Sequence, residues 1–321
     1  MKSHPKIYIK NDQGEIVEAH APVIISASRA TDIPAFYADW LFNRLEQGYV
    51  RWKNPFNGKD SYISFANTRF IVFWSKNPAP LIPHLSKLKE MGIKCYIQYT
   101  LNDYEAELLE PNVPNLQFRV EAFKQLVNIL GKGAVVWRFD PLILTDKIDI
   151  NTLIYKVKNV GDKLSGYTEK LIFSFADIGV YKNVYKNLDN SGIKYREWDE
   201  KEMKEFAERL AQINHESWNY ELATCAEKIN LSEFGISHNR CIDSDLIARL
   251  TRDDAVMQNY LYSTKRDWGQ RKHCGCILAK DIGAYNTCIH GCAYCYATRS
   301  KLTALNNFNK HNQHSYSDSI I

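Results

Sequence analysis

The sequence predicts an α/β fold, a TIM-like parallel β/α barrel that is partial or circularly permuted and carries a C-terminal cluster loop. Two observations indicate it. Short runs rich in β-branched and aromatic residues alternate with amphipathic helical patterns, as in proteins with a parallel sheet. Six such units fall within residues 22–227, which suits one barrel better than two domains. An open, doubly wound sheet is the alternative.

Six runs are predicted as strands buried on both faces, because they are almost continuously apolar. They cover residues 23–28, 70–74, 95–100, 134–139, 171–175 and 220–225. Cys95 lies in the third run. We expect it to be a buried core thiol, since free cysteine is among the most buried residue types.

Five amphipathic helices are predicted between these strands. The first has Asp32 as its N-cap and Pro34 in its first turn, and it ends at Gly48. The others cover residues 81–91, 118–130, 151–160 and 200–213.

The two ends of the chain are predicted to flank the barrel body. Residues 1–21 form a peripheral hairpin in this interpretation. Residues 228–306 are expected to be a cysteine-rich iron–sulfur segment that closes the barrel. Residues 307–321 are expected to be a frayed polar tail, because residues 309–319 lack aliphatic side chains.

Composition restricts the class of protein. An apolar content of 45% can bury a full core, and the net charge of +4 allows nucleic-acid binding without indicating it. Neither an apolar leader nor a run of about 18 apolar residues is present. The sequence therefore predicts a cytoplasmic protein that does not associate with membranes.

Cysteine usage indicates metal chemistry. Seven of the eight cysteines follow residue 224, and the lack of an export signal argues against disulfides. Cys288, Cys292 and Cys295 have the spacing C-x-x-x-C-x-x-C. Three thiolates this close can hold three irons of a four-iron cluster and leave the fourth open to a substrate. A zinc site completed by His290 or another cysteine is the alternative.

This spacing, with Tyr294 directly before the last cysteine, resembles the motif of radical S-adenosylmethionine (SAM) enzymes. In that superfamily the open iron binds the amino and carboxylate groups of SAM. Reduction of the cluster then yields a 5′-deoxyadenosyl radical, which takes a hydrogen atom from the substrate. The resemblance implies a 4Fe-4S cluster, SAM, and a reductant such as flavodoxin or ferredoxin as a partner.

Three further segments extend the resemblance over nearly the whole chain. Residues 26–36, 73–78 and 137–141, together with the C-terminal cysteine block, resemble a bacterial family described as a radical-SAM-like domain of unknown function. This resemblance supplies no reaction.

The cysteine loop departs from the radical-SAM pattern in its position. The usual loop follows the first barrel strand, whereas this one follows at least six strand and helix units. A circular permutation would explain the difference: residues 280–287 would act as the first strand, followed by a helix that begins near Tyr296. Closure of the barrel would then place residues 280–287 beside residues 23–28.

Four other cysteines are interpreted as a second site. Cys225, Cys241, Cys274 and Cys276 are enough for a closed cluster, and Gly275 supplies a turn between the last two. A second iron–sulfur cluster is the expectation. A zinc brace and unligated thiols are the alternatives.

Polar residues at the ends of the predicted strands are candidates for binding and catalysis, because barrel enzymes place their chemistry there. The catalytic candidates are Lys76, Arg138 and Asp140, and the cofactor-binding candidates are Arg29, Asn77, Gln98, Thr100, Ser174 and Tyr294. Arg29 and Lys76 can hold an anionic group, either the SAM carboxylate or part of a substrate. A salt bridge between Arg138 and Asp140 is the structural alternative for that pair.

The sequence therefore predicts reductive cleavage of SAM and hydrogen abstraction from an unknown substrate, more plausibly a small molecule than nucleic acid. One alternative is an iron–sulfur electron-transfer protein that does not bind SAM. A second is a nucleic-acid repair enzyme, because residues 290–297 resemble photoproduct-lyase-like proteins, although no basic and aromatic groove is evident. A barrel that zinc merely stabilises is a third.

Overall fold

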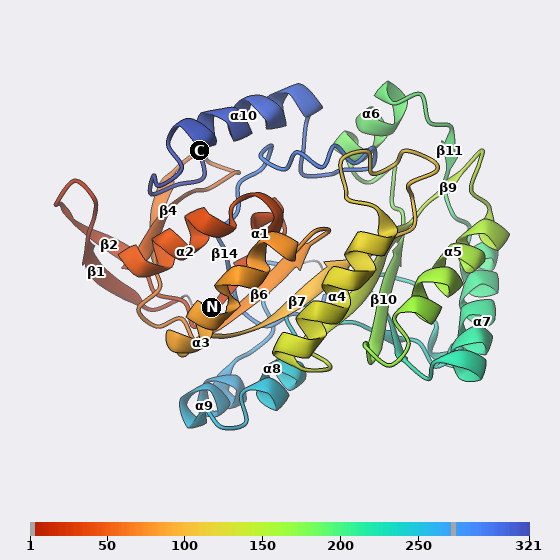
Figure 1. Cartoon of the computed structure of the whole chain (residues 1–321), viewed down its shortest axis with the longest axis horizontal. Coiled ribbons are helices and arrows are strands. Elements are labelled where there is room, and N and C mark those ends of the chain that lie inside the picture. Colours follow the sequence, from red (N-terminus) through yellow and green to blue (C-terminus); the bar gives the residue numbers. More distant parts are fainter. Residues whose placement is uncertain (1–3, 271–273) are drawn as a thin grey trace.

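An eight-stranded, all-parallel sheet forms the centre of the protein (Figure 1). The computed structural model describes residues 4–270 and 274–321. The strand order is β13, β12, β10, β8, β7, β6, β3, β14. These strands are β3 (Ile24–Ala27), β6 (Phe70–Ser75), β7 (Lys94–Thr100), β8 (Val135–Leu142), β10 (Lys170–Phe175), β12 (Glu221–Thr224), β13 (Ser237–His238) and β14 (Lys280–Asp281). The α/β class with a parallel sheet and the six predicted strands are confirmed.

The pairing of β14 with β3 joins the two ends of the central fold. Lys280 lies opposite Ile25 and Asp281 opposite Ser26, in parallel register. Asp281 reinforces the pairing, because its carboxylate accepts hydrogen bonds from Ser26 Oγ at 2.7 Å and Ser28 Oγ at 2.8 Å. The predicted placement of residues 280–287 beside residues 23–28 is thus confirmed at β14.

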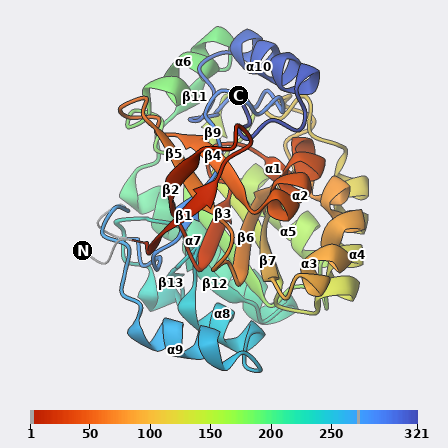
Figure 2. The same cartoon turned by 90° about the vertical axis from the view of Figure 1, so that its left-hand side faces the viewer.

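Helices cover the sheet and its two ends (Figures 1 and 2). The helices are α1 (Ile33–Phe36), α2 (Ala38–Gln47), α3 (Leu85–Glu90), α4 (Leu116–Leu130), α5 (Ile150–Lys163), α6 (Lys182–Asn190), α7 (Glu200–Ser217), α8 (Ser244–Leu250), α9 (Ala255–Ser263) and α10 (Lys301–Gln313). Both views place α6 and α10 at one end of the molecule and α8 and α9 at the other. No helix among the described residues is long and apolar enough to cross a membrane.

Three predicted helices differ in detail. The helix expected over residues 34–48 divides at Tyr37 into α1 and α2, although Asp32 caps α1 and Gly48 ends α2 as expected. The helix expected over residues 81–91 starts as a 3₁₀ helix, Ala79–His84, and α3 begins only at Leu85. The helix predicted to begin near Tyr296 begins at Lys301 instead, because the Ser300 side chain accepts the hydrogen bond of Thr303 N and caps the helix there.

The N-terminal hairpin belongs to a second, four-stranded sheet. It consists of β1 (Lys6–Lys10) and β2 (Ile16–His20), which pair antiparallel as predicted. The hairpin is not isolated, since β2 also pairs with β5 (Asp60–Ser64), and β5 pairs with β4 (Tyr49–Lys53). A short ribbon of β9 (Leu144–Thr145) and β11 (Tyr195–Arg196) lies elsewhere.

The prediction of a frayed tail was wrong. Helix α10 extends to Gln313, and Asp318, Ser319 and Ile320 are buried. Arg51 forms an ion pair with Asp318 at 3.0 Å. The composition of residues 309–319 misled the prediction, because polar side chains of this segment find specific partners in β4, and Ile320 just beyond it packs into the larger core.

Alternating side chains of the central strands face two separate cores. Ile25, Ile71 and Ile97 pack with the helices in the larger core. Their neighbours Ile24 and Phe70 face a smaller core. Cys241, Cys276 and Ile277 also belong to that smaller core, so the segment between β13 and β14 covers this face of the sheet.

Strands β13 and β14 are the two edges of the sheet. The described strands form no ladder between these edges. The segments that continue from them nevertheless meet, because Ile277 N donates a hydrogen bond of 3.1 Å to Ile242 O. Contact between the edges is therefore made by irregular chain rather than by paired strands.

Candidate functional site

Seven cysteines line one cavity of about 350 Å³. Ser75, Thr100 and Ser174 also line it, which places it at the carboxyl ends of β6, β7 and β10. We name Cys288, Cys292 and Cys295 the loop cysteines, and Cys225, Cys241, Cys274 and Cys276 the edge cysteines. Small-molecule sites commonly have this size, and ligands of parallel sheets bind at this end of the strands.

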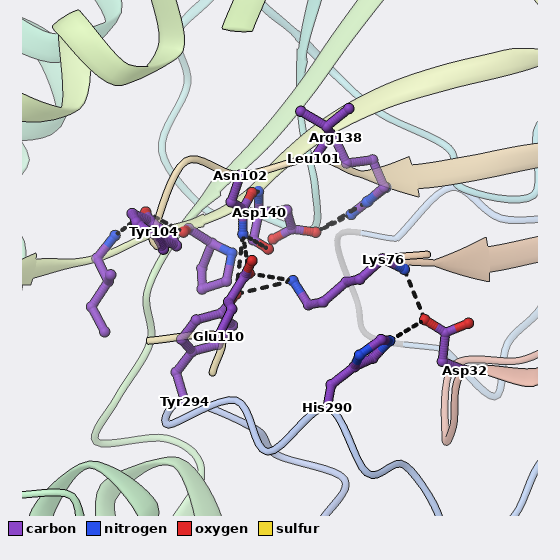
Figure 3. A network of polar contacts seen from close by, with 12 residues as sticks. Asp32, Lys76, Leu101, Asn102, Tyr104, Glu110, Arg138, Asp140, His290 and Tyr294 are labelled. Carbon is purple, nitrogen blue, oxygen red and sulfur yellow. Dashed lines mark hydrogen bonds and ion pairs between the residues drawn. The ribbon is translucent and has the colours of Figure 1, made fainter. Parts of the chain in front are cut away.

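Asp32 ties the cysteine loop to the strands (Figure 3). Its carboxylate pairs with His290 Nε2 at 2.8 Å and accepts hydrogen bonds from Ser75 Oγ at 2.7 Å and Lys76 N at 2.8 Å. It also caps α1 by accepting from Ala35 N. One buried carboxylate thus joins β6, α1 and the loop, and His290 is an anchor of the loop.

Tyr294 forms the second anchor of the loop (Figure 3). Lys76 Nζ and Asn102 Nδ2 each donate a hydrogen bond of 3.0 Å to its hydroxyl oxygen, and the hydroxyl donates to Glu110. The side chains of Asp32, Glu110, Tyr294 and His290 are all buried. The loop cysteines are therefore held from both sides by polar contacts in a water-poor setting.

Lys76 and Glu110 form a buried ion pair with 2.7 Å between Nζ and Oε1. Burial alone would raise the pKa of Glu110, but the positive charges of Lys76 and Arg119 outweigh it and lower the pKa to about 2. Lys76 is correspondingly held protonated, since the attraction of Glu110 outweighs the effect of burial and raises its pKa. The charge of Lys76 is thus already balanced within the protein.

Burial disfavours the thiolate forms of two loop cysteines, Cys288 and Cys292, when no metal is bound. Burial, followed by the negative charge of Asp32, raises the pKa of Cys288 well above its usual value. Burial also raises the pKa of Cys292, although Lys76 opposes it. Binding of a metal to these sulfurs would therefore release protons.

The edge cysteines come from three segments of the chain. Cys225 follows β12, Cys241 follows β13, and Cys274 and Cys276 precede β14. The Sγ atoms of Cys225 and Cys241 are 3.3 Å apart, and no described cysteine forms a disulfide. Hydrogen bonding from Cys225 and Cys276, followed by the guanidinium charge of Arg138, lowers the pKa of Cys241 despite its burial.

Four N–H donors point at the edge sulfurs. Arg138 Nη1 lies 3.3 Å from Cys241 Sγ, and Asn239 Nδ2 lies 3.4 Å from the same atom. Cys276 Sγ accepts from Ile242 N at 3.2 Å and from an Arg29 guanidinium nitrogen at 3.6 Å. Such donors stabilise the thiolate form of a cysteine.

Comparison with known proteins identifies the family. The model of a domain of unknown function, DUF1848, matches residues 24–297. The chain belongs to the DUF1848 family. The match runs from β3 through both cysteine groups and ends before α10. No curated protein and no solved structure matches the chain.

The predicted site residues of this DUF1848 protein divide by position. Among them, Arg29, Lys76, Thr100, Arg138, Asp140, Ser174, Tyr294 and the seven cysteines line the cavity. Gln98 and Asn77 do not line it. Gln98 is buried and donates from Nε2 to Cys241 O at 2.9 Å, so it supports the edge cysteines from behind.

Arg138 and Asp140 form the ion pair that the sequence allowed as a structural alternative. Arg138 Nη1 also donates to Gln98 Oε1 at 3.2 Å, and Ser174 Oγ donates to Asp140. Arg29 places its guanidinium carbon 4.8 Å from the centroid of the Trp74 ring. Both arginines are thus engaged within the protein, Arg138 by Asp140 and Arg29 by Cys276 Sγ and the Trp74 ring.

Sequence reasoning missed several residues of the DUF1848 site. Glu110, Asn102 and Asp281 lie in loops or in the two-residue strand β14, where no periodic pattern distinguishes them. Asp32 was expected only as a helix cap. The dipeptides Asn-Asp at 102–103 and Glu-Pro at 110–111 are of the kind found in ordinary turns. The contacts that Asn102 and Glu110 make with the cysteine loop therefore become evident only in the folded structure.

The DUF1848 loop also separates two cavities. The loop cysteines line a second hollow of about 670 Å³, together with residues of α6 such as Asn187 and Asn190. Lys301, in the first turn of α10, lies at the same hollow. The cysteine loop therefore lies between the cavity lined by the edge cysteines and this second hollow.

Proposed function

We propose that the protein is a radical-SAM-like iron–sulfur enzyme that cleaves SAM reductively and abstracts a hydrogen atom from a bound substrate. The carrying observation is the position of the cysteine loop. Pairing of β14 with β3 brings the loop to the carboxyl ends of the strands, where it faces a cavity lined by both cysteine groups. Barrel enzymes hold their reactive groups at this position.

The donor set of the loop fits a four-iron cluster. Three thiols on one buried loop are soft ligands of the kind that iron–sulfur clusters take, and each would bind a different iron. As placed, no three described His, Cys, Asp or Glu side chains converge on a single metal ion. A cluster does not need such convergence, because its thiolates bind different irons.

The finer fold assignment is part of the same proposal. A circularly permuted, partial barrel would have β14 in the place of the usual first strand and the cysteine loop directly after it. The parallel pairing of β14 with β3 supports this arrangement. So does the contact of Ile277 with Ile242, which brings together the segments beyond the two edge strands.

The residues of this chain have distinct tasks in the proposal. Cys288, Cys292 and Cys295 would hold the cluster, which when bound supplies the electron that cleaves SAM. Arg29 would bind a carboxylate of SAM or an anionic group of the substrate. Asp32 and Tyr294 position the loop, and the Lys76–Glu110 pair stabilises Tyr294 rather than binding an anion.

Anaerobic reconstitution with iron and sulfide tests the proposal. We expect about four irons and four sulfides for the loop, an absorbance typical of iron–sulfur proteins, and 5′-deoxyadenosine after addition of dithionite and SAM. The triple variant with Cys288→Ala, Cys292→Ala and Cys295→Ala should lose all three signals. Cys95→Ala is the matched control, because Cys95 is buried in the larger core, away from the cavity.

An electron-transfer protein without SAM is the second candidate. The presence of a second thiol group in the same cavity favours it, because two adjacent centres can pass electrons. This candidate predicts iron and sulfide without 5′-deoxyadenosine, and reduction by a flavodoxin or ferredoxin that SAM does not alter. Iron-free protein with full thermal stability would contradict both candidates.

A further inference from the structure

The edge cysteines lie where the central sheet has its open ends. Cys241 follows strand β13 closely, and Cys276 precedes strand β14 closely. These are the two edge strands, and no described ladder joins them. The backbone contact Ile277 N to Ile242 O, at 3.1 Å, and the contact Ile242 N to Cys276 Sγ, at 3.2 Å, hold the two segments together. A bond among these sulfurs would therefore connect opposite edges of one sheet.

One short sulfur–sulfur distance in this group favours a single ion over a cluster. Thiolates around a tetrahedral zinc ion bind at about 2.3 Å, which places their sulfurs about 3.8 Å apart. The Sγ atoms of Cys225 and Cys241 are 3.3 Å apart. A four-iron cluster binds each thiolate to a different iron and needs wider spacing. No three described His, Cys, Asp or Glu side chains are placed to hold one metal ion. Binding by all four edge cysteines therefore requires at least one of their side chains to rotate to another staggered rotamer.

The surroundings of these sulfurs compensate part of the charge of a tetrathiolate ion, because Arg29 and Arg138 contact them while Arg138 is also paired with Asp140. Four thiolates around a divalent ion carry a net charge of about −2, which is costly in a buried site unless it is compensated. Arg138 and Arg29 direct guanidinium nitrogens at Cys241 and Cys276. Asn239 and the backbone of Ile242 add neutral donors, and outer hydrogen bonds of this kind support metal ligands.

We propose that Cys225, Cys241, Cys274 and Cys276 bind a single divalent transition-metal ion, zinc in the first instance, that staples the two edges of the sheet. The ion fixes the segment that leads through β14 into the cysteine loop. The site depends on the edge sulfurs and their donors alone. It therefore stands whether or not the loop cysteines bind a cluster and SAM.

Metal analysis of the triple loop variant tests this site in isolation. The full-length variant with Cys288→Ala, Cys292→Ala and Cys295→Ala should bind one zinc per chain. Cobalt(II) should replace it and give the intense visible bands of a tetrahedral thiolate site. Added zinc should raise the melting temperature, because an ion that binds only the folded state stabilises it. A further Cys241→Ser substitution should remove the zinc, the cobalt bands and the stabilisation.

Three results would overturn the proposal. Equal amounts of iron and acid-labile sulfide in the loop variant would show a second cluster instead. Octahedral cobalt spectra, or zinc binding that survives Cys241→Ser, would show that other groups bind the ion. If the loop variant does not fold, Cys274→Ala in the otherwise intact protein serves instead: it should remove zinc while iron bound to the loop persists, and unchanged zinc would reject the site.

Discussion

The loop cysteines and the edge cysteines line one cavity but are held in different ways. The loop cysteines lie within eight consecutive residues, and buried carboxylates, Asp32 and Glu110, anchor their loop through His290 and Tyr294. The edge cysteines are contributed by distant segments, and guanidinium groups contact their sulfurs directly. The loop thus has acidic supports behind it, whereas the edge group has cationic donors on its sulfurs. This difference fits the proposed cluster with one open iron in the first case and the proposed closed structural ion in the second.

Substituting one cysteine of each group should separate their roles most strongly. Cys292→Ala should abolish formation of 5′-deoxyadenosine and most cluster assembly while zinc remains, because the loop then has only two thiols. Cys241→Ala should remove zinc while the loop still binds iron. Elemental analysis and product assay of both variants provide the measurement. If either substitution removed iron and zinc equally, the loop cysteines and the edge cysteines would form one site. The distinction between the two groups would then be wrong.

Asp32→Ala should cost the next largest amount. The substitution leaves His290, Ser75 and the backbone of Lys76 without their acceptor, and we expect about 3 to 5 kcal/mol of lost unfolding free energy. Urea unfolding measures this loss. Asp39→Ala is the control, because Asp39 is exposed and its pair with His84 should contribute less than about 1 kcal/mol. An equal loss of unfolding free energy in the two variants would contradict the anchoring role of Asp32.

Glu110 should make the loop anchor sensitive to acid. Its pKa is about 2 in the folded protein against an ordinary 4.5, so the unfolded chain takes up the proton first as the pH falls. The resulting stabilisation, about 3 kcal/mol, is complete above about pH 4.5 and disappears as the pH approaches 2. Unfolding free energies of the intact protein and Glu110→Gln should converge over that range. A constant difference at all pH values would contradict this assignment.

Asn239→Ala should give the smallest effect, on the edge group alone. Loss of the hydrogen bond from Asn239 Nδ2 to Cys241 Sγ should weaken zinc binding about 10-fold. Competition with a chromophoric chelator measures the affinity. Iron content of the loop should not change. Equal loss of iron and zinc would indicate that Asn239 acts on the whole cavity rather than on the edge sulfurs.

The fold was predictable where burial leaves a pattern in the sequence. Strands β3, β6 and β7 lie between two cores, and nearly every residue of a strand such as β6 is therefore apolar. Helix α6 was missed because only Val184 and Leu188 of its residues are buried, which leaves a mostly polar sequence. The tail was misjudged for the related reason that Asp318 is fixed by an ion pair.

The candidate site was predictable in its cysteines and in most of the polar residues at the strand ends. Spacing alone identified the loop cysteines, and number alone suggested that the edge cysteines belong together. Arg138 and Asp140 were recognisable as partners because residues two apart in a strand share a face. Glu110 carried no such signal, since its partners Lys76 and Tyr294 come from opposite thirds of the chain.

The pairing of β14 with β3 also affects how the protein is made. Ser26 and Asp281 are separated by 255 positions, so the free edge of β3 stays uncovered until residues 280–281 have been synthesised. An unpaired parallel edge slows folding and invites association with other chains. During synthesis the other strands of the central sheet would thus be complete for some time before the cysteine loop, which lines the cavity, has been made. The cysteine loop can take its place only after most of the polypeptide has folded, so that any cluster bound there would assemble late, inside an almost complete protein.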